Sequence, residues 1–85
     1  MVNKCKLLER VRNNPRDVRF PDLVSLAEAH GFVLDRSEGS HRVYKHARVR
    51  ELLNLQPRKD GKAKPYQVGE FLARVDEYGL KLERE

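Results

Sequence analysis

The sequence of 85 residues contains one cysteine and no tryptophan, and it has no long run of apolar residues. A single cysteine cannot form an internal disulfide, which agrees with a reducing cytoplasm. No apolar stretch approaches the roughly 20 residues that a membrane span requires. Residues 1–6 also lack the apolar core of a secretory signal. The composition therefore predicts a cytoplasmic protein without a membrane segment.

Several kinds of catalytic site are also missing from the sequence. There is no glycine pattern typical of a P-loop or of a dinucleotide site. His41 and His46 are five residues apart in a predicted strand, so they should point to opposite faces and lie roughly 16 Å apart. No cysteine cluster or carboxylate pair at ligand spacing accompanies them. Ser40 and His41 should also face apart, which disfavours a Ser–His nucleophile pair. We therefore expect neither a metal nor a cofactor.

The sequence does contain a concentrated excess of positive charge. The formal net charge is +1 over residues 1–39, +6 over residues 40–64 and −2 over residues 65–85. A basic band of this kind is typical of proteins that bind a polyanion. The alternative is a lysine-rich loop that only contacts solvent. The size of the chain predicts a single domain that folds around one small core.

Apolar periodicity, together with proline and glycine positions, predicts three helices and three strands. In chain order they are helix 3–14, helix 21–30, strand 32–36, strand 41–46, strand 52–56 and helix 65–78. Consecutive strands flanked by helices predict an α+β fold, α-α-β-β-β-α, with helices on one face of a three-stranded antiparallel sheet. Residues 58–64 should form a mobile basic loop, and residues 80–83 alternate as a short edge strand does.

The most informative stretch is the turn Gly39-Ser40 followed by the strand that begins at His41. A histidine titrates near neutral pH, so His41 can accept and donate protons. Arg42 and Lys45 would attract phosphate, although they should lie on opposite faces of the strand. RNA supplies its own nucleophile, the 2′-hydroxyl, so a single proton-transferring group suits RNA cleavage. The alternative is that His41 is an ordinary surface or packing residue.

Other residues of this region have simpler expected roles. Lys62 and Lys64 precede the last helix, where the helix dipole favours anions, and we expect them to hold the RNA backbone. Tyr44 should belong to the core, and His30 should be structural at a helix end. We expect His46 to be an exposed residue without a special role.

Four blocks of the sequence resemble HicA-type toxins, the YcfA-like mRNA interferases. They are Gly39-Ser40-His41 after a strand that starts Gly31-Phe32, Arg19-Phe20-Pro21-Asp22-Leu23, Leu53-Asn54-Leu55-Gln56-Pro57, and Ala63-Lys64-Pro65-Tyr66-Gln67-Val68. The last block resembles a longer branch of that family. The resemblance covers roughly residues 19–80, which makes residues 1–18 an extra N-terminal helix and connector of a single domain.

The resemblance implies a double-stranded-RNA-binding-domain-like fold and the role of toxin in a type II toxin–antitoxin system. It also implies mRNA endoribonuclease activity without a metal, with His41 as the essential general acid or base and Gly39 and Ser40 in support. The expected partners are RNA and a HicB-like antitoxin protein. Arg42 departs from the second histidine or aliphatic residue of many members. A non-catalytic RNA-binding module of the same fold, or a protein-interaction domain with a basic face, are the alternative interpretations.

Overall fold

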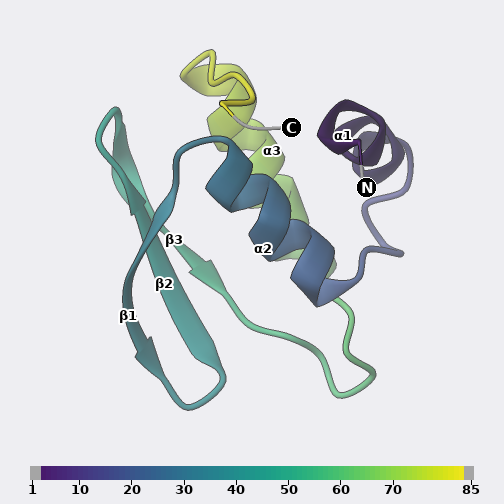
Figure 1. The fold of residues 1–85 in the computed structure, drawn as a ribbon. Helices are drawn as coiled ribbons and strands as arrows, with labels where there is room; N and C mark the ends of the chain where they lie inside the picture. Colours follow the sequence, from purple (N-terminus) through teal and green to yellow (C-terminus); the bar gives the residue numbers. More distant parts are fainter. Residues whose placement is uncertain (1–2, 84–85) are drawn as a thin grey trace.

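The computed structural model describes residues 3–83, and the order of its elements confirms the predicted α-α-β-β-β-α arrangement (Figure 1). The elements are α1 (Lys4–Asn13), α2 (Phe20–Ala29), β1 (Val33–Glu38), β2 (His41–His46), β3 (Val49–Leu55) and α3 (Pro65–Glu77). None of the helices among residues 3–83 has the length and apolarity that a membrane span requires.

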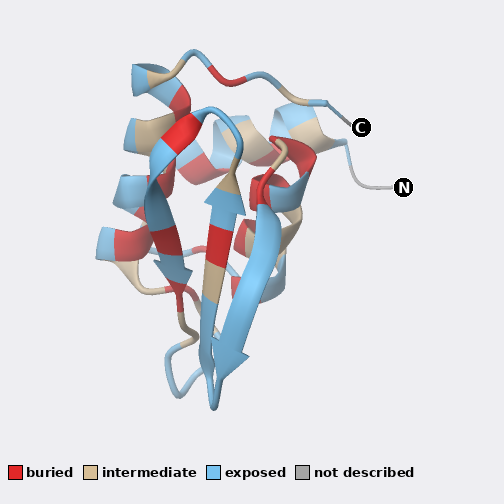
Figure 2. Ribbon diagram, turned by 90° about the vertical axis from the view of Figure 1, so that its left-hand side faces the viewer, coloured by how far each residue is buried: buried red, intermediate tan, exposed pale blue. Residues whose placement is uncertain are grey.

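The three strands form an antiparallel sheet in the order β1-β2-β3. The helices lie on one side of this sheet, and its other face is open (Figure 1). Figure 2 shows that the buried residues of the sheet lie on β2 and β3, whereas β1 is exposed along its whole length. Tyr44 is only 2% exposed, which confirms the prediction that it belongs to the core. The buried side of β2 is therefore the side that carries Tyr44.

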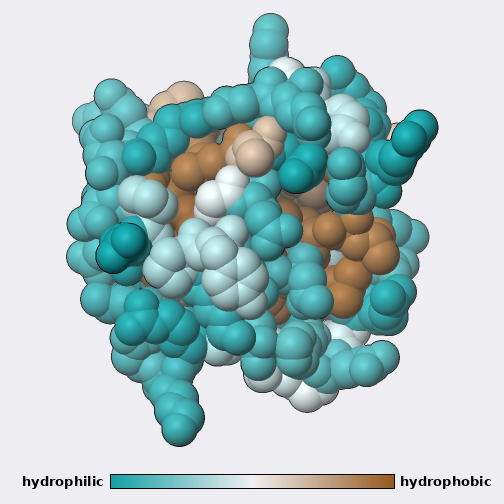
Figure 3. All heavy atoms as spheres, turned by 180° about the vertical axis from the view of Figure 1, so that it is seen from behind, coloured by the Kyte–Doolittle hydropathy of each residue, from teal (hydrophilic) through white to brown (hydrophobic). Residues whose placement is uncertain are grey.

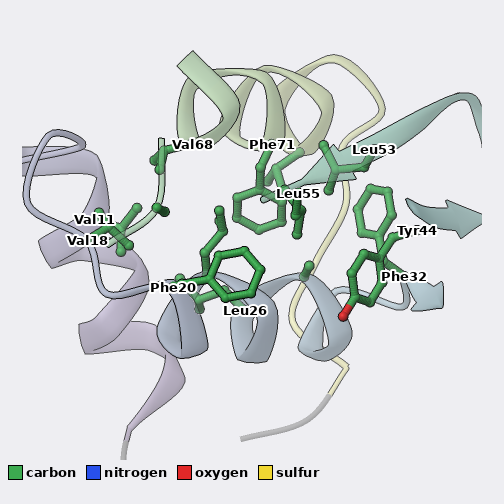
Figure 4. Close-up of a cluster of buried hydrophobic side chains, with 14 of the residues drawn as sticks. Val11, Val18, Phe20, Leu26, Phe32, Tyr44, Leu53, Leu55, Val68 and Phe71 are labelled. Carbon is green, nitrogen blue, oxygen red and sulfur yellow. The ribbon is translucent and has the colours of Figure 1, made fainter. Parts of the chain in front are cut away.

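The core lies between the sheet and the helices, and it draws on every helix (Figure 4). Both α2 and α3 contribute fully buried side chains, because apolar residues recur on one face at helical spacing. The helix α1 adds Leu7 and Val11, which are 4% and 2% exposed. Side chains labelled in Figure 4 include Phe20, Leu26, Phe32, Leu53, Leu55, Val68 and Phe71.

The start of α2 and that of α3 follow the expected use of proline. Each helix has a proline in its first turn, where the missing N–H would have no helical partner. The end of α2 is capped by His30, after which Gly31 takes a φ of +97°. His30 is 1% exposed, and its Nδ1 donates to the carbonyl of Leu26 at 2.7 Å. The structural role expected for His30 is thus confirmed.

Two strands are longer than the sequence predicted. β1 continues past Arg36 to Glu38, and β3 begins at Val49, three residues before the predicted start. The pairing partners explain both extensions, since Glu38 lies opposite His41 and Val49 lies opposite His46. Hydrogen bonding to the central strand therefore overrides the weak strand propensity of the charged residues.

Residues 58–64 and 80–83 also differ from their predictions. Ala63 is fully buried and its N–H donates to the carbonyl of Val18 at 2.7 Å, so the basic segment is held against the connector rather than mobile. Residues 80–83 form no strand. Leu80 is buried there instead, and the N–H of Glu83 donates to the carbonyl of Ala29.

Most of the remaining surface is polar. Figure 3 shows a rear face that is mainly hydrophilic, with hydrophobic residues restricted to separate patches. The large hydrophobic side chains that are clearly exposed are Val33, Leu34, Leu52 and Tyr66. With 36% charged residues, this surface agrees with a small globular domain.

Candidate functional site

The β1–β2 hairpin is closed by a two-residue turn, Gly39-Ser40. Gly39 has a φ of +58° and Ser40 does not have a positive φ, which is typical of a type II′ turn with glycine in its first central position. This turn fixes the register so that Glu38 pairs with His41. His41 is exposed, and its imidazole makes no hydrogen bond or ion pair within residues 3–83. The ring is therefore accessible at the tip of the hairpin.

Alternation along β2 divides its polar side chains between the two faces of the sheet. Arg42 is on the face of buried Tyr44, and its guanidinium lies over the ring of Phe20, 5.6 Å from the ring centroid. His41 and Lys45 are on the open face. The structure therefore places Lys45 on the same face as His41, towards the other end of β2, and Arg42 on the opposite face, as expected from strand alternation.

His41 borders a hollow on the open face of the sheet, with a volume of about 310 Å³. Arg36, Glu38, Val43 and Asn54 line it together with His41. Its size is at the lower end for small-ligand pockets, so it suits a segment of an extended chain better than an enclosed cofactor. Sequence reasoning missed Arg36, Glu38 and Asn54. The two-residue turn was the available signal, because it sets which residues lie beside His41.

One carboxylate partly neutralises the cations of the open face. Asp35 lies in an irregularity of β1 between Leu34 and Arg36. Its Oδ2 accepts from Arg36 at 2.9 Å, and its Oδ1 is 3.4 Å from the Nζ of Lys45. Since both pairs are exposed, they hold the cations loosely and a phosphate can compete for them.

The turn is joined to the start of α3 by the side chain of Gln56, which follows β3. Its Nε2 donates to the Oγ of Ser40 at 3.1 Å, and its Oε1 accepts from the Nζ of Lys64 at 2.8 Å. The backbone N–H of Gln56 donates to the Oε1 of Gln67 at 2.8 Å. The structure thus connects two predicted site residues, Ser40 and Lys64, through a residue to which sequence reasoning gave no site role.

Lys62, the other predicted RNA-binding lysine, is paired with the connector that precedes α2. Its Nζ is 2.6 Å from the Oδ1 of Asp17. This hydrogen bond, and the charge of Lys62, hold the pKa of Asp17 below its ordinary value. Figures 1 and 2 show that the segment carrying Lys62 and the β1–β2 turn lie at the same end of the molecule.

His46 has a structural role, contrary to the expectation that it would have none. Its Nε2 donates to the carbonyl of His30 at 2.9 Å, and its Nδ1 accepts the backbone N–H of Arg48 at 3.0 Å. The ring also packs edge-on against Phe32, with centroids 5.0 Å apart. Nε2 therefore attaches the end of β2 to the end of α2, and Nδ1 holds the turn between β2 and β3. Among the described residues, no group of three or more histidine, cysteine or carboxylate side chains is arranged to hold a metal.

These features define a small α+β protein with the double-stranded-RNA-binding-domain-like architecture and an accessible histidine at the tip of its first hairpin. A family described as "HicA toxin of bacterial toxin-antitoxin" matches residues 20–75, which is more than half of the chain. The chain therefore belongs to the HicA toxin family, which confirms the resemblance to HicA-type toxins, and it is a toxin whose partner is an antitoxin. The resemblance to a longer branch stays a prediction. No curated protein and no solved structure matched it.

Proposed function

We propose that this toxin is an mRNA endoribonuclease of a type II system in which His41 transfers protons without a metal ion. The observation that carries the proposal is the exposed imidazole of His41, which has no partner within residues 3–83 and borders the hollow on the open face. A ring held in a hydrogen-bond network, such as that of His46, is already committed to the fold. With mRNA as its substrate, the toxin acts in the cytoplasm.

The reaction needs no nucleophile from the protein. His41 takes the proton of the 2′-hydroxyl while the 2′-oxygen attacks the phosphorus and the bond from phosphorus to the 5′-oxygen breaks. The leaving 5′-oxygen then receives a proton, either from His41 in turn or from water, and the other product is a cyclic phosphate. General acid–base catalysis of this kind contributes about 10²- to 10⁴-fold in rate. Glu38 lies opposite His41 in the register and lines the same hollow.

Cations on both sides of the hairpin tip support RNA binding. Lys45 and Arg36 flank the open face, and Arg42 and Lys64 lie on the side of the helices. Since these groups are on opposite faces of β2, an RNA strand that contacts both must bend around the sheet. A flexible single strand can follow this path more easily than a rigid duplex.

The partner of the toxin is proposed to be a HicB-like antitoxin that covers the same open face. The open face also carries exposed apolar side chains, Val33 and Leu52, which are each 53% exposed. An antitoxin seated there would compete with RNA for the histidine.

A second candidate is a non-catalytic RNA-binding module of the same fold. It is favoured by the cations before α3, Lys62 and Lys64, since basic residues at a helix start can hold phosphates without any proton transfer. In this case His41 is an ordinary surface residue.

One experiment separates the two candidates. Purified wild-type protein and His41→Ala are incubated with a long single-stranded RNA in the presence of EDTA, and cleavage and binding are both measured. We expect cleavage by the wild type alone, with RNA binding retained in the variant. Glu70→Ala, an exposed change on α3, serves as the control. If neither protein cleaves while both bind, the catalytic proposal is wrong and the binding module takes its place.

A further inference from the structure

The side-chain amide of Gln56 has an orientation that its partners dictate. The ammonium group of Lys64 has only hydrogens to donate, so the atom of Gln56 that faces it must be the oxygen. The nitrogen of the amide then faces Ser40 and donates to its Oγ. A reversed amide would place two sets of donors against each other at Lys64.

This orientation determines whether the hydroxyl of Ser40 can donate a hydrogen bond to a ligand. Because its oxygen accepts from Gln56, its own hydroxyl hydrogen remains to be donated, and no acceptor receives it within residues 3–83. Ser40 is exposed in the turn immediately before His41. The hydroxyl of Ser40 is therefore still able to donate a hydrogen bond while its oxygen accepts from Gln56.

Lys64 differs from the other lysines around the site in the charge of its partner. Lys45 and Lys62 lie beside the carboxylates of Asp35 and Asp17. Lys64 is held instead by the neutral oxygen of Gln56, so its position is fixed while its charge is not neutralised. The ammonium has two further hydrogens that it can donate.

Gln56 itself is fixed by the fold. Its backbone N–H donates to Gln67, which lies in the first turn of α3 and is 4% exposed. The next residue, Pro57, forms a backbone bridge with Ala63, directly before Lys64. The end of β3 and the start of α3 therefore fix the backbone from which the amide of Gln56 extends.

We infer that the Oγ–H of Ser40 and the Nζ of Lys64 bind one phosphodiester group of the RNA at the helix side of the hairpin turn, and that Gln56 positions both donors. A phosphodiester is the ligand of choice because its two non-bridging oxygens, which share one negative charge, can accept from one neutral and one charged donor. The inference rests on the proposed function, which it deepens by assigning a phosphate subsite. Gln56 is a positioning residue in it, not a catalytic one.

The test uses a short fluorescent RNA of mixed sequence in which every 2′-hydroxyl is methylated, so that it binds but cannot be cleaved. Affinity is measured by anisotropy over a range of salt concentrations. We expect Lys64→Gln to reduce the log–log salt slope by about 0.7, the value for one phosphate contact on a single strand. Gln56→Met removes no charge, yet it should weaken binding too, because it releases the ammonium and the hydroxyl.

The double variant Gln56→Met/Lys64→Gln supplies the decisive comparison. If Gln56 acts through Lys64, Gln56→Met weakens binding far less in the Lys64→Gln background than in the wild type. Ser40→Thr, which keeps a hydroxyl, should bind nearly as the wild type does, whereas Ser40→Ala should bind more weakly. Additive effects of Gln56→Met and Lys64→Gln, or equal losses in Ser40→Thr and Ser40→Ala, would overturn the subsite.

The outcome is separable from that of the cleavage experiment. The methylated probe reports binding alone, so the expected coupling with no cleavage of natural RNA leaves the subsite intact and removes the ribonuclease proposal. If cleavage depends on His41 but Gln56→Met and Lys64→Gln act independently, the ribonuclease proposal stands and the phosphate subsite is wrong. Urea unfolding of each variant shows whether a loss of binding comes from a loss of folding. Because Ser40 is exposed, Ser40→Thr and Ser40→Ala should change the stability of the fold least.

Discussion

Two glycines with left-handed backbone conformations differ in what surrounds them. Gly39, in the hairpin turn, has a φ of +58°, and a Cβ added there would meet no atom within 4 Å. Gly31, after α2, has a φ of +97°, and its Cβ would lie 2.6 Å from the Oε2 of Glu83 and 2.8 Å from the Nε2 of His46. The second of these atoms is the nitrogen that donates to the carbonyl of His30. The first glycine is required by the backbone alone, and the second also by the space that His46 occupies.

The same substitution at both glycines should therefore have unequal effects. Gly39→Ala should cost about 1–2 kcal/mol, the strain of placing an L-residue in this conformation. Gly31→Ala should cost more, because it also displaces His46 from the end of α2. Urea unfolding of the two variants provides the measurement. Equal losses would mean that the contact between His46 and His30 contributes little to stability.

At the scale of elements, α1 lies outside the matched range but is packed into the same core. Leu7 is 4% exposed, whereas Arg12 on the same helix is exposed and pairs with Asp76 of α3 at 2.9 Å. The division into an extra segment 1–18 and a core 19–80 remains a prediction. The packing nevertheless indicates that α1 contributes to the stability of the whole domain.

Two substitutions in α1 distinguish burial from surface pairing. Leu7→Ala should destabilise the protein by about 2–5 kcal/mol, because it leaves a cavity under the helix. Arg12→Gln should leave the unfolding free energy close to that of the wild type, since exposed ion pairs contribute little. Both are measured by urea unfolding. A small effect of Leu7→Ala would show that α1 is an independent appendage.

Helices and strands could be predicted where the residues that specify them lie within one segment of the chain. α3 could be predicted because its proline, its apolar stripe and Gly79 are all contained in one segment. β1 was predicted to end at Arg36, since only pairing with β2 makes Ser37 and Glu38 part of a strand. Residues 58–64 contain no large apolar residue, so nothing local indicated that Ala63 is buried.

The same limit applied to the site. His41 could be selected because its turn and its chemistry lie in adjacent residues. Gln56 could not be selected, since its partners Ser40, Lys64 and Gln67 come from separate parts of the chain. An amide in a sequence gives no indication of which groups it will join.

At the scale of the whole molecule, hydrogen bonds and nearby cations depress the pKa values of three exposed carboxyl groups. Hydrogen bonds from Lys62, Tyr78 and Arg12 are the largest causes for Asp17, Glu51 and Asp76, respectively. Each pair joins elements distant in the chain, and none of the carboxyl groups is buried. Correspondingly, the pKa of Tyr78 is raised, because its phenol donates to Glu51.

These shifts predict how stability depends on acid. Because the folded-state pKa values are lowered, the unfolded chain binds more protons, so stability is fully present above the ordinary values of 3.8 and 4.5 and falls below them. Urea unfolding across this range measures the loss. Asp17→Asn should reduce the dependence of the unfolding free energy on pH, because it removes one of the three titrating groups. Stability that is constant or that rises on acidification would contradict the role of these pairs.

The irregularity at Asp35 in β1 has a consequence for association between chains. β1 is an outer strand, exposed along its whole length, and such an edge can recruit extended segments from other molecules. An extra residue in the strand twists it and interrupts the regular spacing of its outward N–H and C=O groups. The adjoining charges of Asp35 and Arg36 add a desolvation cost to any such pairing. The toxin can therefore leave its strand edge uncovered and still resist aggregation.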